Sequence, residues 1–342
     1  LHVIRIQANE AREADKISEP CGRVFPHSLL STDETDESNC SILIMTSTTV
    51  RMSNGVELPL LGLGTSLVKE KLQLEDAIRT AFDVGYRYVD TAPVYGTESA
   101  IGDVIEEYVN SGRLKRSDLF ICTKLPAHAN RPELAAVVFE RSLRNLRSDY
   151  VDLYLPNNEA TSPLLDDEGR IIPEVDFSLL DTWRFMESLY KSGRVRSIGL
   201  SNVNSKQLKE IYDAAEIKPH NIQVASIFGE RELLDLCHKL DIAVTSYGTL
   251  CSPGRSLNKP GVAQVDGIRH PIVEELARAY DRSPAQIVLR FMTQNKISCI
   301  PKSVTPERIR QNIQIFDFEL SEDDRKKFDS IEPEARLFTY VK

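Results

Sequence analysis

Residues 119–155 read LFICTKLPAHANRPELAAVVFERSLRNLRSDYVDLYL, and this segment contains the repeating unit of the fold. It begins and ends with short apolar runs, at residues 119–125 and 152–155, that do not alternate strictly with polar residues. Such runs are typical of strands buried on both faces of a parallel sheet. Residues 132–146, between them, have the amphipathic spacing of a helix. The segment therefore predicts a strand, a crossover helix and a parallel neighbouring strand.

The same alternation continues in both directions, about eight times in all from residue 48 onward. The other strands are expected at residues 61–65, 88–92, 196–201, 221–225, 243–247 and 297–301. The other helices are expected at residues 75–84, 98–111, 178–192, 205–214, 230–239, 271–280, 284–294 and 306–316, with Ser205 as a candidate N-cap. Eight β/α pairs in one run predict an α/β fold, a (β/α)8 TIM barrel.

Residues 48–64 precede the first β/α pair and predict an N-terminal β-hairpin cap, because Ser53-Asn54-Gly55 is a turn sequence between two short apolar pieces. A doubly wound sheet is the alternative architecture. It is disfavoured because Gly62-Leu63-Gly64-Thr65 lacks the third glycine of a dinucleotide-binding loop and the helix that should begin there.

The composition of the 342 residues, 41% hydrophobic and 27% charged, is typical of a globular protein and excludes a fibrous or fully disordered chain. A net charge of -9 repels nucleic acid and anionic lipid, so we expect neither a nucleic-acid nor a membrane partner. The 6 cysteines form no CxxC pair, which favours free thiols and predicts no metal site.

Residues 1–44 differ in composition from the rest, with 4 basic against 8 acidic residues and no apolar run after a basic start. They are not typical of a signal peptide or a mitochondrial presequence, so we expect a cytoplasmic protein. We expect residues 1–44 to be a disordered extension or an artefact of gene prediction, and residues 48–342 to form the barrel. An ordered arm against the barrel is the alternative for residues 1–44.

Polar side chains at the carboxyl ends of the predicted strands are the candidates for chemistry, because barrel active sites lie there. Asp90 and Lys124 occupy two such ends, and Tyr95 lies in the loop after Asp90. A phenol has a pKa of about 10, which a nearby ammonium lowers. Tyr95 is therefore predicted to be a general acid with a lowered pKa. The alternative is a structural Asp90–Lys124 ion pair with Tyr95 packed in its loop.

Residues 300–312 are a second candidate site, because they run from a strand end into a helix start. Backbone amides at a helix N-terminus attract anions, and Lys302 and Arg308 add charged donors. This pattern favours a nucleotide phosphate. A solvated basic helix end is the alternative.

The sequence resembles the aldo-keto reductases in several motifs that occur in the same order. The motifs are GYRYVDTA at 85–92, YGTE at 95–98, DLYL at 152–155, GLSN at 199–202 and IPKS at 300–303. The resemblance implies a barrel, monomeric in many members, that binds NADPH and reduces a small-molecule aldehyde or ketone to an alcohol. Lys302 and Arg308 are the reason to prefer NADPH over NADH.

The resemblance also implies roles for individual residues. Asp90, Tyr95 and Lys124 match three catalytic residues of the family, with Tyr95 as the proton donor, and Asn157 occupies the position of the fourth, a histidine. The implied cofactor-binding residues are Thr65, Asp90, Ser201, Asn202, Gln223, Tyr247, Leu250, Ser252, Lys302, Ser303, Val304, Thr305, Arg308, Gln311 and Asn312. Of these, Ser201, Asn202 and Gln223 match residues that hold the nicotinamide carboxamide, and Tyr247 the ring that stacks on it.

Asn157 is the main departure from the family pattern. An asparagine amide can donate a hydrogen bond to a carbonyl oxygen, but it cannot change its protonation state. The potassium-channel β-subunits, a divergent branch of the family, also have asparagine there. We therefore expect slow carbonyl reduction, with an NADPH-binding pseudoenzyme or a redox-sensing regulatory protein as the alternative.

Overall fold

The computed structural model describes residues 48–129, 131–156, 178–225, 231–250, 267–329 and 331. The chain divides into two units, Leu1–Ile44 and Met45–Lys342, and all described residues belong to the second. The expectation for residues 1–44 lies outside the described residues and stays a prediction.

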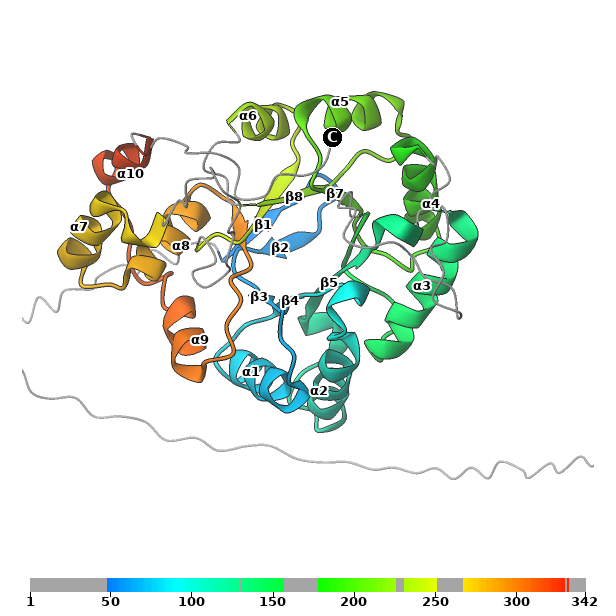
Figure 1. Ribbon diagram of the computed structural model, residues 1–342, viewed down its shortest axis with the longest axis horizontal. Helices are drawn as coiled ribbons and strands as arrows, with labels where there is room; N and C mark the ends of the chain where they lie inside the picture. The colour runs from blue at the N-terminus through cyan, green and yellow to red at the C-terminus, as the bar shows by residue number, and fades with distance from the viewer. Residues whose placement is uncertain are drawn as a thin grey trace, which may run out of the picture. The chain divides into compact units, whose positions relative to one another are not determined.

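Two four-stranded parallel sheets form the centre of the second unit (Figure 1). The first sheet consists of β3 (Leu63–Gly64), β4 (Tyr88–Asp90), β5 (Phe120–Leu125) and β6 (Leu153–Pro156), in that order. The second consists of β7 (Gly199–Ser201), β8 (Asn221–Ala225), β9 (Ala243–Tyr247) and β10 (Ser298–Cys299).

Parallel bridges join the two sheets at both edges. Leu61 pairs with Cys299 and Gly64 with Lys302 on one side, and Tyr154 pairs with Ile198 on the other. The strands therefore follow one another in a cyclic order from β3 to β10 and back, as a (β/α)8 barrel requires. This order confirms the predicted fold class, and the doubly wound alternative is wrong.

Helices surround the strands (Figure 1). Their bounds are α1 Lys71–Asp83, α2 Glu98–Asn110, α3 Pro132–Asn145, α4 Leu179–Lys191, α5 Ser205–Ala214, α6 Arg231–Lys239, α7 Pro271–Tyr280, α8 Pro284–Gln294, α9 Pro306–Ile313 and α10 Glu322–Asp329. Short 3-10 helices occur at η1 Pro93–Tyr95, η2 Arg116–Asp118, η3 Ala127–Ala129 and η4 Gly267–Arg269. The predicted N-cap of α5 is wrong by one residue. Asn204 is the cap, because its side chain accepts from the Gln207 amide and the Gln207 side chain accepts in return.

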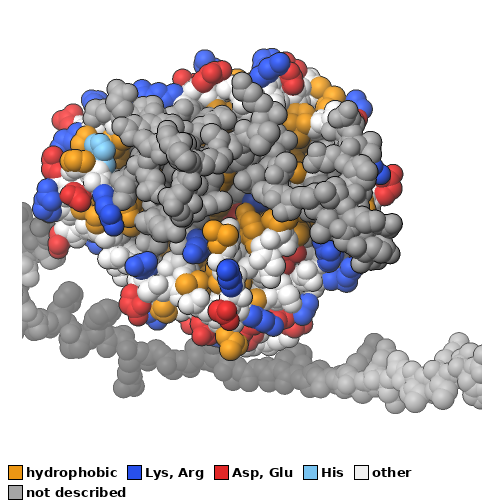
Figure 2. Space-filling view, viewed as in Figure 1, with side chains coloured by type: hydrophobic (Ala, Val, Ile, Leu, Met, Phe, Trp, Pro, Cys, Tyr) orange, Lys and Arg blue, Asp and Glu red, His pale blue; other side chains and the backbone are white. Residues whose placement is uncertain are grey.

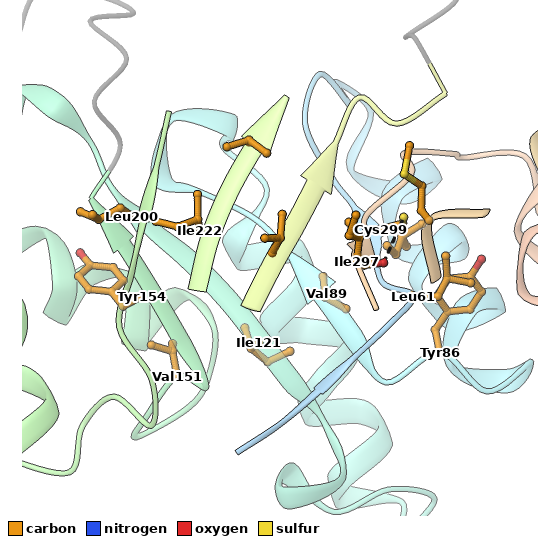
Figure 3. Close-up of a cluster of buried hydrophobic side chains, with 14 of the residues drawn as sticks. Leu61, Tyr86, Val89, Ile121, Val151, Tyr154, Leu200, Ile222, Ile297 and Cys299 are labelled. Atoms are coloured by element: carbon orange, nitrogen blue, oxygen red, sulfur yellow. Dashed lines mark hydrogen bonds between the residues drawn. The ribbon is translucent and has the colours of Figure 1, made fainter. Parts of the chain in front are cut away.

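The apolar side chains of the strands face two separate cores. Tyr88, Phe120 and Leu155 pack in the interior of the ring with residues of other strands. Ile121 and Tyr154 belong instead to the larger cluster between strands and helices, where neighbouring strands contribute side chains side by side (Figure 3). Since successive residues point to opposite faces of a strand, this division places Lys124 on the same face of β5 as Phe120.

A hairpin of β1 (Thr49–Arg51) and β2 (Glu57–Pro59) closes the amino-terminal end of the barrel, as the turn sequence predicts. Met52 and Leu58 pack into the interior cluster. The Asn54 side chain donates to Arg196 O at 3.0 Å, at the start of the segment leading into β7. The carboxyl ends of the strands lie at the opposite end of the ring, which we name the mouth of the barrel.

The surface mixes both signs of charge. Figure 2 shows basic and acidic side chains interspersed over the described part of one face. Several of them form ion pairs, such as Lys71 with Asp103 at 2.8 Å and Arg194 with Glu140 at 3.1 Å. In the described ranges we find no helix with the length and apolar content needed to cross a bilayer.

Candidate active site

Three side chains from three strands meet inside the mouth of the barrel. Lys124, on β5, donates to Asp90 Oδ1 at 2.6 Å, and Gln223, on β8, donates to Asp90 Oδ2 at 2.8 Å. Both carboxylate oxygens of Asp90 are thus committed, and all three residues are at most 3% exposed. Lys124 also donates to Thr91 O at 3.0 Å. The Gln223–Asp90 bond crosses the interior, because β4 and β8 belong to different sheets.

The surroundings of Lys124 keep its ammonium charged. Burial by itself lowers the pKa of Lys124, since the interior disfavours a charge. The charge and hydrogen bond of Asp90, together with Tyr95 and Cys122, outweigh this effect and raise the pKa above its usual value. The nearby Cys122 thiol stays neutral, because burial and the charge of Asp90 both raise its pKa well above the ordinary value.

Tyr95 lies over this ion pair, at the end of η1. Lys124 Nζ is 5.3 Å from the centre of the Tyr95 ring. Burial raises the pKa of Tyr95, Lys124 lowers it, Asp90 raises it again, and the net direction is upward from 10.0. The prediction of a lowered pKa is therefore wrong, because the cost of burying a phenolate exceeds the attraction of Lys124. A phenol that holds its proton at neutral pH can still act as a general acid.

The ends of β7 and β9 bring further polar groups to the mouth. Ser201 and Asn202 are buried, and Asn202 has a left-handed backbone with φ 61°. This conformation is uncommon outside glycine but tolerated by asparagine. The backbone N–H of Asn202 donates to Gln223 O at 3.1 Å. The side chain of Asn202 accepts through Oδ1 from Tyr247 Oη at 2.9 Å. The structure thus brings together four of the predicted residues, Ser201, Asn202, Gln223 and Tyr247. Their role as one cofactor subsite stays a prediction.

The second candidate site lies where the chain leaves β10 and enters α9. Lys302 pairs with Gly64 of β3, and its side chain is exposed. Ser303 Oγ accepts from the Thr305 amide at 3.1 Å, which shapes the turn before Pro306. Arg308 is exposed on the first turns of α9, and Asn312 is buried on the same helix. Donors and positive charge thus surround the start of one helix, a chemistry that suits a phosphate.

The remaining predicted residues have other surroundings. Thr65 is fully buried, and its hydroxyl donates to Asp90 O at 2.9 Å. Leu250 and Val304 are partly buried, and Gln311 is exposed on α9. Asn157 and Ser252 lie outside the described residues. The roles of all these residues stay predictions.

Comparison with known proteins decides the family. The model of the Aldo/keto reductase family matches residues 60–333. The chain belongs to the aldo-keto reductase family. Among its relatives, aldo-keto reductase family 1 member A1 of Bos taurus is 36% identical over 301 residues, covering 86% of this chain and 92% of the relative. The protein of that name in Xenopus tropicalis is 39% identical over 282 residues, covering 79% and 84% of the two chains.

A solved structure gives the same result for the fold of this aldo-keto reductase. The aldose reductase from Schistosoma japonicum superposes with a TM-score of 0.75 and 34% identity, covering 85% of this chain and 94% of that one. Membership makes the chain an oxidoreductase that acts on small carbonyl compounds with a nicotinamide cofactor. The donor set at the mouth and the basic start of α9 fit such a cofactor in chemistry, since one end offers amides and hydroxyls and the other offers cations.

Sequence reasoning assigned no role to two residues of this aldo-keto reductase that lie next to Tyr95. Thr97 and Glu98 are each 2% exposed, and their side chains bond to residues directly after β3 and β4 and to a residue of β5. The YGTE motif contains both, but its letters do not show which strands the two side chains contact.

Proposed function

We propose that this aldo-keto reductase reduces an aldehyde or ketone to an alcohol with NADPH, and that Tyr95 donates the proton. The observation that supports this most directly is the buried Asp90–Lys124 ion pair beside the Tyr95 ring. A buried ion pair often contributes little net stability compared with apolar residues of similar volume, because desolvation offsets the attraction. Stability therefore does not by itself account for the Asp90–Lys124 pair, which favours a catalytic role for it.

The chain's own groups divide the work as follows. NADPH, when bound, supplies a hydride to the carbonyl carbon. Tyr95 Oη hydrogen-bonds the carbonyl oxygen and gives it a proton, which leaves a phenolate. The ammonium of Lys124 stabilises that phenolate, and Asp90 holds Lys124 charged and in place. General acid catalysis of this kind contributes roughly 10² to 10⁴ in rate.

We propose that the cofactor lies across the mouth, from Ser201, Asn202, Gln223 and Tyr247 to the start of α9. Lys302 and Arg308 would hold the 2′-phosphate and so select NADPH over NADH. What supports this is the exposure of both side chains at the helix start. The proposed cofactor site is completed by Thr65, Leu250, Ser252, Ser303, Val304, Thr305, Gln311 and Asn312.

A second candidate function follows from Asn157. If the carbonyl is only hydrogen-bonded there and receives no help from a titrating group, turnover is slow, and the chain acts mainly as an NADPH-binding sensor. The two functions share the fold and the cofactor, so they differ in rate and not in binding.

Mixing the protein with NADPH and a panel of aldehydes and ketones tests the first function, with absorbance for turnover and fluorescence for binding. Tyr95→Phe is expected to lower kcat by about 10² or more while cofactor affinity stays within about threefold. Tyr212→Phe, on the outer helix α5, is the matched control and should leave both unchanged. Full activity in Tyr95→Phe would refute the assignment of the proton donor.

Asn157→His separates the two candidate functions. A rise in kcat of about tenfold or more is expected if asparagine limits turnover, because histidine offers a titratable donor. Tight NADPH binding with no turnover in either form would favour the sensor.

Three further expectations from the sequence are also proposals. Residues 1–44 are expected to be a disordered extension or a gene-prediction artefact, and the protein is expected to be a cytoplasmic monomer. Limited proteolysis tests the first, and light scattering with size-exclusion chromatography tests the monomer. Imaging of the tagged full chain tests the location.

A further inference from the structure

The loop that carries Tyr95 is tied to the barrel at its base by a buried cluster of threonines. Thr91 and Thr97, at the two ends of the loop, join their hydroxyls at 2.8 Å. Thr97 also bonds Thr65, of the segment after β3, at 3.2 Å. These three residues, which we name the threonine cluster, are 0 to 2% exposed.

The threonine cluster is connected to the catalytic ion pair through the backbone. Thr65 Oγ1 donates to Asp90 O at 2.9 Å, and Lys124 Nζ donates to Thr91 O at 3.0 Å. The hydroxyl of Thr97 is therefore two hydrogen bonds away from both members of the pair. Gly96, with φ 67°, turns the chain between Tyr95 and Thr97.

Glu98 makes a second connection on the other side of β5. Its Oε1 accepts from Thr123 Oγ1 at 2.7 Å, and Thr123 precedes Lys124 in the strand. Its Oε2 accepts from Asn145 Nδ2 at 3.4 Å, at the end of α3. Among the described residues, Glu98 has no ion-pair partner although it is 2% exposed. Glu98 is also the first residue of α2, so the two hydrogen bonds fix the start of that helix.

We infer that Thr97 and Glu98 are positioning residues for the proposed reduction. They hold the loop that carries Tyr95 against the strand that carries Lys124. The phenol hydroxyl of Tyr95 and the ammonium of Lys124 therefore keep a fixed separation. This inference rests on the proposed function, because it assigns the two residues to the geometry of the proton donor. Displacement of a reacting group by about 1 Å costs roughly 10²-fold in rate.

Amide hydrogen exchange and kinetics on Thr97→Val test the inference. Valine keeps the shape and removes both hydroxyl bonds, so exchange in residues 91–98 should rise about tenfold or more. We expect kcat to fall about 10-fold to 100-fold, the solvent deuterium isotope effect on kcat to increase, and NADPH affinity to stay within about threefold. Thr97→Ser keeps the hydroxyl and should restore the wild-type exchange rate, kcat and solvent isotope effect.

Thr293→Val is the matched control. Thr293 is also buried, and its hydroxyl donates to Arg290 O at 3.2 Å within α8. It should lower the melting temperature as Thr97→Val does, with unchanged exchange in residues 91–98 and unchanged kcat. The inference is overturned if Thr97→Val and Thr293→Val lose the same stability while kcat and the isotope effect of Thr97→Val stay unchanged. That result would mean that Thr97 has only a structural role.

Glu98 provides a second test that does not depend on Thr97. Glu98→Gln keeps an acceptor for Thr123 and should hold kcat within about threefold, whereas Glu98→Leu should lower kcat as Thr97→Val does. Equal kcat in the two Glu98 variants would contradict the inference for this residue. Should the wild type show no turnover at all, the proposed function fails, and the exchange data alone decide whether the two residues fix the loop.

Discussion

Lys124 Nζ lies 2.6 Å from Asp90 Oδ1, and neither side chain is more than 4% exposed. Removing one partner of such a buried pair costs roughly 3–5 kcal/mol, because the other charge is left without compensation. The pair is therefore a fixed electrostatic feature beneath Tyr95. Its effect on the proton donor can be measured through the pH dependence of turnover.

The alkaline limb of kcat for reduction should report the pKa of Tyr95. The acid must be protonated, and its pKa is raised above 10.0, so we expect kcat to be level from about pH 6 to 9 and to fall only above about pH 10. Lys124→Met removes the group that lowers this pKa, so the limb should move to still higher pH while kcat falls by about 10² or more. Stopped-flow absorbance of the cofactor over this range measures both.

Lys206→Met, on the exposed face of α5, is the control for loss of a lysine and should leave the profile unchanged. A limb that moves to lower pH in Lys124→Met would contradict the assignment of Lys124 as the group that stabilises the phenolate.

Arg308 and Arg310 form a matched pair for testing cofactor selection, since both are exposed on α9. A charge-assisted hydrogen bond is worth about 1.5–3 kcal/mol, so Arg308→Ala should weaken NADPH binding roughly 10-fold to 150-fold. NADH affinity should change by less than about threefold, because NADH lacks the 2′-phosphate. Fluorescence titration with both cofactors measures the ratio. Equal losses for the two cofactors, or an equal effect of Arg310→Ala, would place the phosphate elsewhere.

Much of the fold could be predicted from the sequence, because the spacing of apolar residues and the residues typical of element ends agree in most helices and strands. The bounds of β8, β9, α5, α7 and α8 match the predicted ranges. The strand expected at 297–301 is shorter, since Pro301 has no amide to donate and only Ser298–Cys299 joins the ladder. Neighbouring residues Asn204 and Ser205 are both good caps, and the decisive signal was Gln207, three residues after Asn204.

The candidate site was predictable only in part. Strand-end position was enough to single out Asp90 and Lys124, because the rule for barrels depends on order along the chain. The bond between Gln223 and Asp90 was not predictable, since only closure of the ring brings β8 opposite β4. The direction of the Tyr95 pKa was predicted wrongly, because the degree of burial is a tertiary property that a motif does not contain.

His220 should make the protein sensitive to mild acid. Burial lowers the pKa of His220 to about 4 from 6.5, and its Nδ1 accepts from the Ile198 amide at 3.1 Å, where the chains lead into β7 and β8. The unfolded chain therefore binds this proton more readily than the folded one. The contribution of neutral His220 to the free energy of unfolding is complete above pH 6.5 and is lost as the pH falls toward 4. Between pH 7 and pH 5 the loss is about 2 kcal/mol.

His220→Asn isolates this contribution, because the asparagine oxygen can still accept from Ile198 while the side chain does not titrate. Urea unfolding at pH 7 and pH 5 should show a smaller loss of stability in His220→Asn than in the wild type, by about 2 kcal/mol. His238→Asn, exposed on α6, should lose as much as the wild type does. An identical loss in wild type and His220→Asn would mean that the acid sensitivity arises from other groups, with the carboxylates of the buried pairs as the next to test.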